Sequence, residues 1–60
     1  MYYWYRTETG EYIGAGPQAP TESDISSTDQ SPQIGQYYDF DTGYTKQAFW
    51  TGTEWRYEDI

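Results

Sequence analysis

The apolar side chains of this chain are almost all aromatic. Its 60 residues include eight Tyr, three Trp and two Phe, but only four Ile, three Ala and one Met, with neither Leu nor Val. Aromatic residues favour strands, and Tyr and Trp tolerate partial burial because each has a polar tip. We therefore expect a small β-structure with an aromatic core. Because so short a chain cannot enclose all of its rings, we also expect some of them to bind a partner.

The length and the missing residue types restrict the function further. A chain of 60 residues forms one domain at most, and a domain of that size is marginally stable alone. The absence of Cys and His removes disulfides, zinc–thiolate sites and the commonest general base. No apolar run approaches the length of a membrane span, and no signal-peptide pattern is present. The sequence thus predicts a non-enzymatic protein without a cofactor, a metal or a membrane segment.

The charge is strongly one-sided, with ten acids, three bases and a net charge of -7. Nucleic acids and anionic membranes are poor partners, because only Arg6, Lys46 and Arg56 are available to pair with phosphates. Two interpretations of the acids stay open. They keep a Tyr-rich protein soluble, or they imitate DNA phosphates and block a nucleic-acid-binding enzyme.

The order of the residues predicts an all-β fold, either a small antiparallel sheet or a partial barrel. Residues 2–13 are expected to form a hairpin, since an aromatic run precedes the turn residues 7–10 and a short returning strand follows them. Gly10 suits the positive φ that such a turn needs. Within residues 1–13, the aromatic run of the first strand places rings on both faces of that strand. Such an arrangement suits a strand packed between two surfaces.

Residues 14–36 differ in composition and predict a long irregular arm. They begin with a Gly/Pro cluster and continue through a stretch rich in Ser, Thr and Asp. Residues 21–24 have the pattern of a capped helical turn. We expect the arm to lie extended on another surface, with Ile25 and Ile34 as its apolar anchors.

Residues 37–58 predict a three-stranded meander, with turns at Thr42-Gly43 and Thr51-Gly52. In its first strand, residues 37–41, Tyr38 and Phe40 share one face. The loop type at Thr51-Gly52 sets the register of the last two strands, and the sequence does not decide it. The spacing from Tyr5 to Thr9-Gly10 recurs from Tyr38 to Thr42-Gly43, which is typical of a reused turn rather than of a solenoid.

Two patterns bear on ligand chemistry. Asp39-x-Asp41-x-Gly43 resembles the start of a calcium loop, but the glycine is one place early and the twelfth position holds Trp50 instead of Glu. We therefore expect these two acids on the solvent face of a strand. The indoles of Trp4, Trp50 and Trp55 have two interpretations, as the hydrophobic core or as a platform that stacks on sugar rings.

Three segments together resemble a known kind of protein. They are residues 5–14 (YRTETGEYIG), residues 49–55 (FWTGTEW) after a Pro-containing acidic spacer, and the closing Glu58-Asp59. This arrangement resembles short segments of bacteriophage virion and tail-fibre-associated proteins. The resemblance implies a small β-module that attaches to a larger phage structural protein or assists its assembly. Those assembly proteins are longer, which leaves open a tail, a capsid or a host-directed role.

The expected function is that of a phage virion accessory protein, made in the host cytoplasm, that decorates or cements a capsid or tail in many symmetric copies. The alternatives are an acidic inhibitor of a host nucleic-acid enzyme and a small carbohydrate-binding module. The residues expected to contact the partner are large and apolar or aromatic: Tyr2, Trp4, Ile25, Ile34, Tyr37, Tyr44, Trp50, Trp55 and Tyr57.

Overall fold

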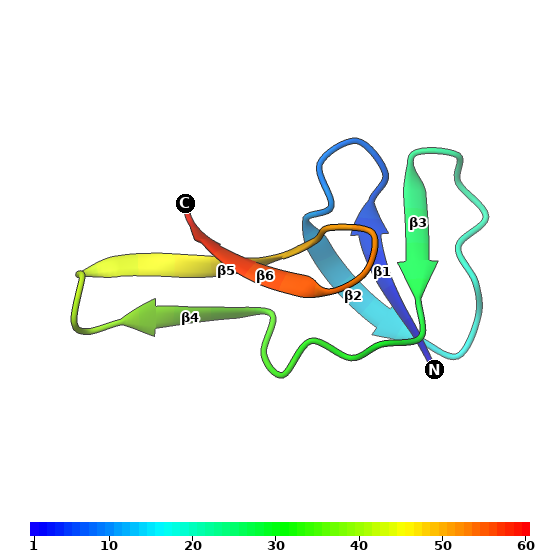
Figure 1. Cartoon of the computed structure of the whole chain (residues 1–60). Helices are drawn as coiled ribbons and strands as arrows, with labels where there is room; N and C mark the ends of the chain where they lie inside the picture. The colour runs from blue at the N-terminus through cyan, green and yellow to red at the C-terminus, as the bar shows by residue number, and fades with distance from the viewer.

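The chain forms six strands in two small antiparallel sheets and contains no helix (Figure 1). A computed structural model describes all 60 residues. The first sheet has the order β2-β1-β3, and the second has the order β4-β5-β6. The strand bounds are β1 Tyr2–Arg6, β2 Tyr12–Gly16, β3 Ile25–Thr28, β4 Gln36–Asp39, β5 Tyr44–Trp50 and β6 Trp55–Asp59. The predicted all-β class, the N-terminal hairpin and the C-terminal meander are confirmed, and the sheets do not close into a barrel.

The segment 14–36 is more regular than the predicted arm. Its first residues complete β2, and β3 pairs antiparallel with the other edge of β1. The N–H of Thr7 donates to the carbonyl of Asp24 at 3.0 Å, and the Thr7 hydroxyl lies 2.6 Å from that of Ser26. Residues 21–24, whose pattern could also cap a helical turn, form a non-helical turn. The unpaired edge of β1 explains the difference, because its backbone groups need partners and β3 supplies them.

Strand β5 joins the two sheets. Its first half pairs with β4, whereas its second half continues along the same edge to the β1–β2 hairpin. There the Trp50 N–H donates to the Gly10 carbonyl at 2.8 Å, and Glu11 bridges to Phe49. The buried side chain of Gln47 adds a hydrogen bond from Nε2 to the Tyr12 carbonyl at 3.1 Å. One long strand therefore belongs to both halves of the molecule.

The core is an aromatic cluster where the sheets meet, formed by Tyr5, Tyr12, Trp50 and Trp55. The two indoles lie 5.2 Å apart, and Trp55 also meets both Tyr rings edge-on, at 6.1 and 5.4 Å. Such edge-to-face pairs add about 0.5–1.5 kcal/mol each beyond the area that they bury. All four rings are half-buried, and the buried apolar side chains are the small ones of Pro32 and Ala48. An aromatic core was expected, and its incomplete burial reflects the small size of the domain.

Polar tips of aromatic side chains hold the two segments that follow β2 and β3. The indole N–H of Trp4 donates to the Gln18 carbonyl at 3.0 Å, and that of Trp55 donates to the Gln30 carbonyl at 2.6 Å. The Tyr57 hydroxyl donates to the Ile34 carbonyl at 2.7 Å and accepts the N–H of the same residue at 3.1 Å. Residues 17–34 are thus fastened to the chain's own sheets rather than left free to extend over another protein.

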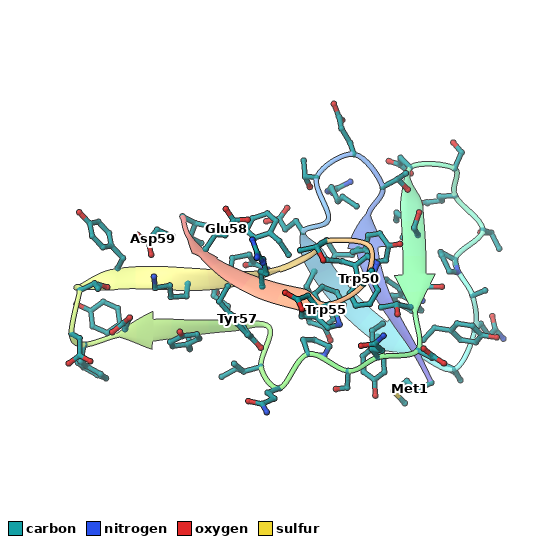
Figure 2. All side chains as sticks on the ribbon, in the orientation of Figure 1. Met1, Trp50, Trp55, Tyr57, Glu58 and Asp59 are labelled. Carbon is teal, nitrogen blue, oxygen red and sulfur yellow. The ribbon has the colours of Figure 1, made fainter.

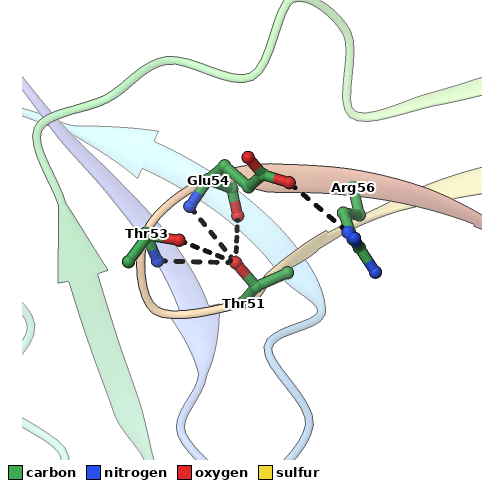
Figure 3. A network of polar contacts seen from close by, with 4 residues as sticks. All are labelled: Thr51, Thr53, Glu54 and Arg56. Atoms are coloured by element: carbon green, nitrogen blue, oxygen red, sulfur yellow. Dashed lines mark hydrogen bonds and ion pairs between the residues drawn. The ribbon is translucent and has the colours of Figure 1, made fainter.

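The β5–β6 hairpin has a four-residue connection, Thr51 to Glu54, between the paired Trp50 and Trp55. The Thr51 hydroxyl organises it, accepting the N–H of Thr53 at 3.4 Å and of Glu54 at 3.2 Å (Figure 3). The same hydroxyl donates to the Glu54 carbonyl at 3.1 Å. This connection fixes the register that the sequence left open, and it places the two indoles opposite each other.

Candidate functional site

The most exposed aromatic rings lie at the far end of the β4–β5 hairpin, which extends away from the first sheet (Figure 1). Phe40 is 89% exposed, Tyr44 56% and Tyr38 52%. The rings of Tyr38 and Phe40 meet edge-on with centroids 4.8 Å apart. These three residues, hereafter the aromatic tip, form an apolar projection of a kind that marks interaction sites on small soluble proteins.

The local sequence builds the tip through its turn. Asp39 and Tyr44 close the hairpin, and the Gly43 N–H donates to the Asp39 carbonyl at 2.8 Å. The Asp39 carboxylate accepts the Asp41 N–H at 2.9 Å, which fixes the chain around Phe40. The pattern that resembled a calcium loop is therefore an Asx turn, and no group of three or more acidic side chains is gathered to hold a metal ion.

The charges around the tip are acidic. Asp39 and Asp41 flank Phe40, and the one base in the hairpin, Lys46, pairs with Asp59 at 2.6 Å. The hydrogen bond that Lys46 donates to the Asp59 carboxylate, together with the negative charges of Asp59 and Asp39, raises the pKa of Lys46 above its ordinary 10.5. The positive charge of Lys46 is therefore engaged by Asp59. A partner that binds the tip would meet apolar rings with the carboxylates of Asp39 and Asp41 beside them.

Three of the residues predicted to bind a partner are internal. Trp50 and Trp55 belong to the aromatic cluster, and the half-buried Tyr57 is fixed by its hydrogen bonds to Ile34 (Figure 2). Tyr37 packs edge-on against Tyr57 at 5.5 Å and is 37% exposed. These rings hold the two sheets and the connection together, and Tyr37 is the one among them that is exposed rather than half-buried.

The remaining predicted residues lie apart from one another. Tyr44 belongs to the aromatic tip, whereas Tyr2 is exposed on β1 and Ile34 is exposed where the connection reaches β4. Trp4 and Ile25 line a small pocket on the first sheet. The structure therefore divides the predicted set among the core, the tip, a separate pocket and single exposed positions such as Tyr2 and Ile34.

The three indoles do not form one flat platform. The planes of Trp50 and Trp55 are inclined by 60°, and Trp50 also pairs with Tyr5 and Trp55 with Tyr12. Trp4 makes no ring pair with either indole, and its own ring lies over the glycines of β2. Stacking of a sugar on all three indoles together would require them to share a plane.

Sequence reasoning missed two members of the tip, Tyr38 and Phe40. Both were placed on one face of a predicted strand 37–41, but β4 ends at Asp39 and Phe40 begins the turn. The signal was present, because a Phe followed by Asp-Thr-Gly is a large apolar residue in a turn, where it has no sheet to pack against.

Comparisons with protein-family models, with curated proteins and with solved structures gave no significant match to this chain. The structure contains no helix that is long and apolar enough to cross a membrane.

Proposed function

We propose that this protein is a non-enzymatic interaction module that docks through its aromatic tip into an apolar groove on a larger protein. The observation that supports the proposal is the near-complete exposure of Phe40, 89%, at the end of a projecting hairpin. A folded chain gains nothing from holding a large ring in water, whereas an exposed ring supplies a binding anchor at low entropic cost.

The charge of the tip defines the partner. Asp39 and Asp41 flank Phe40, and the net charge of the chain is -7. A groove with a basic rim would complement both features, since opposite potentials steer association and exclude acidic competitors. The partner is therefore a protein whose apolar groove is bordered by Lys or Arg.

The resemblance to phage virion segments supports a narrower form of the proposal, in which the larger protein belongs to a capsid or tail. Purified particles would then contain the chain in a fixed, symmetric number of copies, which quantitative mass spectrometry measures. Binding would also persist as salt is raised, because apolar contacts dominate it. A steep loss of binding with salt would instead favour an acidic inhibitor that imitates DNA.

Photo-crosslinking tests the docking surface directly. The photoreactive residue p-benzoylphenylalanine replaces Phe40 in one variant and the exposed Ile13 of β2 in a control, both produced in the native host. We expect one protein to crosslink from position 40 and not from position 13. With that protein purified, Phe40→Ser should weaken binding at least tenfold, as for a buried aromatic anchor. Unchanged affinity in Phe40→Ser would refute the proposal.

A further inference from the structure

A small pocket opens on the first sheet, away from the aromatic tip. It measures about 170 Å³ and is lined by Trp4, Pro20, Thr21, Glu22 and Ile25. Sites for drug-sized ligands are larger, about 300–1,000 Å³. The pocket therefore suits the end of one side chain rather than a metabolite.

The aromatic wall of the pocket is fixed in place. The indole N–H of Trp4 is held by the Gln18 carbonyl at 3.0 Å. The ring also lies against β2 so closely that a Cβ on Gly16 would come within 2.6 Å of Trp4 Cη2. Ile25 is carried by β3 on the same face of the sheet, since it pairs with Arg6, two residues after Trp4. A ligand thus meets a wall that needs no ordering on binding.

The one ionised group in the lining is the Glu22 carboxylate, which is exposed and forms no ion pair. Arg6 is the base that the first sheet carries. It does not line the pocket, and it pairs with Asp24 at 3.8 Å. The other two bases, Lys46 and Arg56, pair with acids on the second sheet. The pocket therefore combines an indole with an uncompensated negative charge.

We propose that this pocket binds an arginine side chain of a partner protein. The planar guanidinium stacks on the indole of Trp4 while its N–H groups donate to the Glu22 carboxylate, and Pro20 and Ile25 contact the methylene stem. Arginine fits better than lysine because the guanidinium is weakly hydrated, stacks on aromatic faces and donates to a carboxylate in a forked geometry. The site goes beyond the aromatic tip and gives the chain a second, independent point of attachment.

Binding of a free arginine derivative tests the pocket without any partner. Nα-acetyl-arginine-methylamide is titrated into the ¹⁵N-labelled protein, and the three indole N–H signals are followed by NMR. We expect the Trp4 signal to shift with a millimolar dissociation constant, while those of Trp50 and Trp55 stay in place. The neutral isostere, Nα-acetyl-citrulline-methylamide, should leave all three signals unchanged.

Two variants distinguish the effect of the pocket carboxylate on arginine binding from the effect of the overall charge of the chain. Glu22→Gln should weaken arginine binding about tenfold, whereas Glu58→Gln on β6 removes the same charge elsewhere and should have no effect. Phe40→Ser should also leave arginine binding intact, so the pocket and the aromatic tip fail or succeed separately. Equal shifts with citrulline, no shift of Trp4, or equal binding by Glu22→Gln would each overturn the proposal.

Discussion

Two hairpin turns of this protein share a sequence pattern and a backbone geometry. The docked turn comprises residues 7–10 and the free turn residues 40–43, and both end in Thr-Gly. Their last residues, Gly10 and Gly43, have φ of 85° and 78°. In each turn the glycine N–H donates to the carbonyl of the residue before the turn, at 2.7 Å in the docked turn and 2.8 Å in the free turn. The repeat noticed in the sequence is therefore one turn used twice.

The surroundings of the two turns differ completely. Gly10 is buried against β5, where its carbonyl accepts the Trp50 N–H. Gly43 is exposed, and the closest atom to a Cβ built on it would be the Tyr38 hydroxyl oxygen at 3.8 Å. Local residues therefore specify the shape of each turn, whereas the strand beside it decides whether the turn stabilises the fold or lies exposed on the surface.

The largest difference in stability between the two turns should appear when Gly10 and Gly43 are each replaced by alanine. In Gly10→Ala the new Cβ would lie 2.4 Å from the Trp50 carbonyl oxygen, in addition to the cost of positive φ, so we expect a loss of about 3 kcal/mol. Gly43→Ala has only the backbone cost, about 1 kcal/mol. Urea unfolding followed by near-ultraviolet circular dichroism measures both. Equal losses in the two variants would contradict the difference in docking.

Substitution of the two threonines should show where the turns remain alike. The Thr9 hydroxyl accepts the Glu11 N–H at 3.2 Å, and the Thr42 hydroxyl accepts the Tyr44 N–H at 3.4 Å. Because both bonds are long and exposed, Thr→Val should cost about 0.5 kcal/mol at either position. The same unfolding measurement applies, with Thr21→Val as the control, because the Thr21 side chain is exposed and lies outside both turns. A clearly larger loss at Thr9 would mean that docking also strengthens the turn itself.

The smallest effect should come from the ion pair of the projecting hairpin. Asp59 raises the pKa of Lys46 above 10.5, so the pair stabilises the fold fully below that pH and is lost as the pH rises through the folded-state pKa. Stability measured between about pH 9 and pH 12 should fall less in Lys46→Arg, because a guanidinium stays charged there. The two proteins have all their other side chains in common, so the contributions of those side chains cancel in the comparison. Identical pH profiles would show that the pair contributes nothing.

The hairpin and the meander could be predicted from sequence because their signals are local. Thr-Gly turns and alternating rings lie within a few residues of each other, and positive φ at Gly10 was predicted and is confirmed. Strand β3 could not be predicted in this way. Its residues, Ile25–Thr28, are mostly small and polar, and composition alone indicates a linker. The edge of β1, about twenty residues earlier, decides their conformation.

The candidate site was predicted in part for a similar reason. Composition shows that some rings must be exposed, but not which ones. Trp50 and Trp55 lie in the core because the 51–54 connection places them opposite each other. Phe40 lies on the surface because β4 ends at Asp39. Both outcomes depend on where strands stop, and strand ends are set by pairing across the sheet rather than by the residues themselves.

The double membership of β5 has a consequence for hydrogen exchange. The first residues of this strand pair with β4 beside an exposed turn, and the last residues pair with the docked turn beside the aromatic cluster. Opening of the projecting hairpin would release the amide protons near Tyr44 while those near Trp50 stay protected until the whole domain unfolds. A single strand of seven residues would then report two opening free energies, one for the projecting hairpin and one for the residues beside the aromatic cluster.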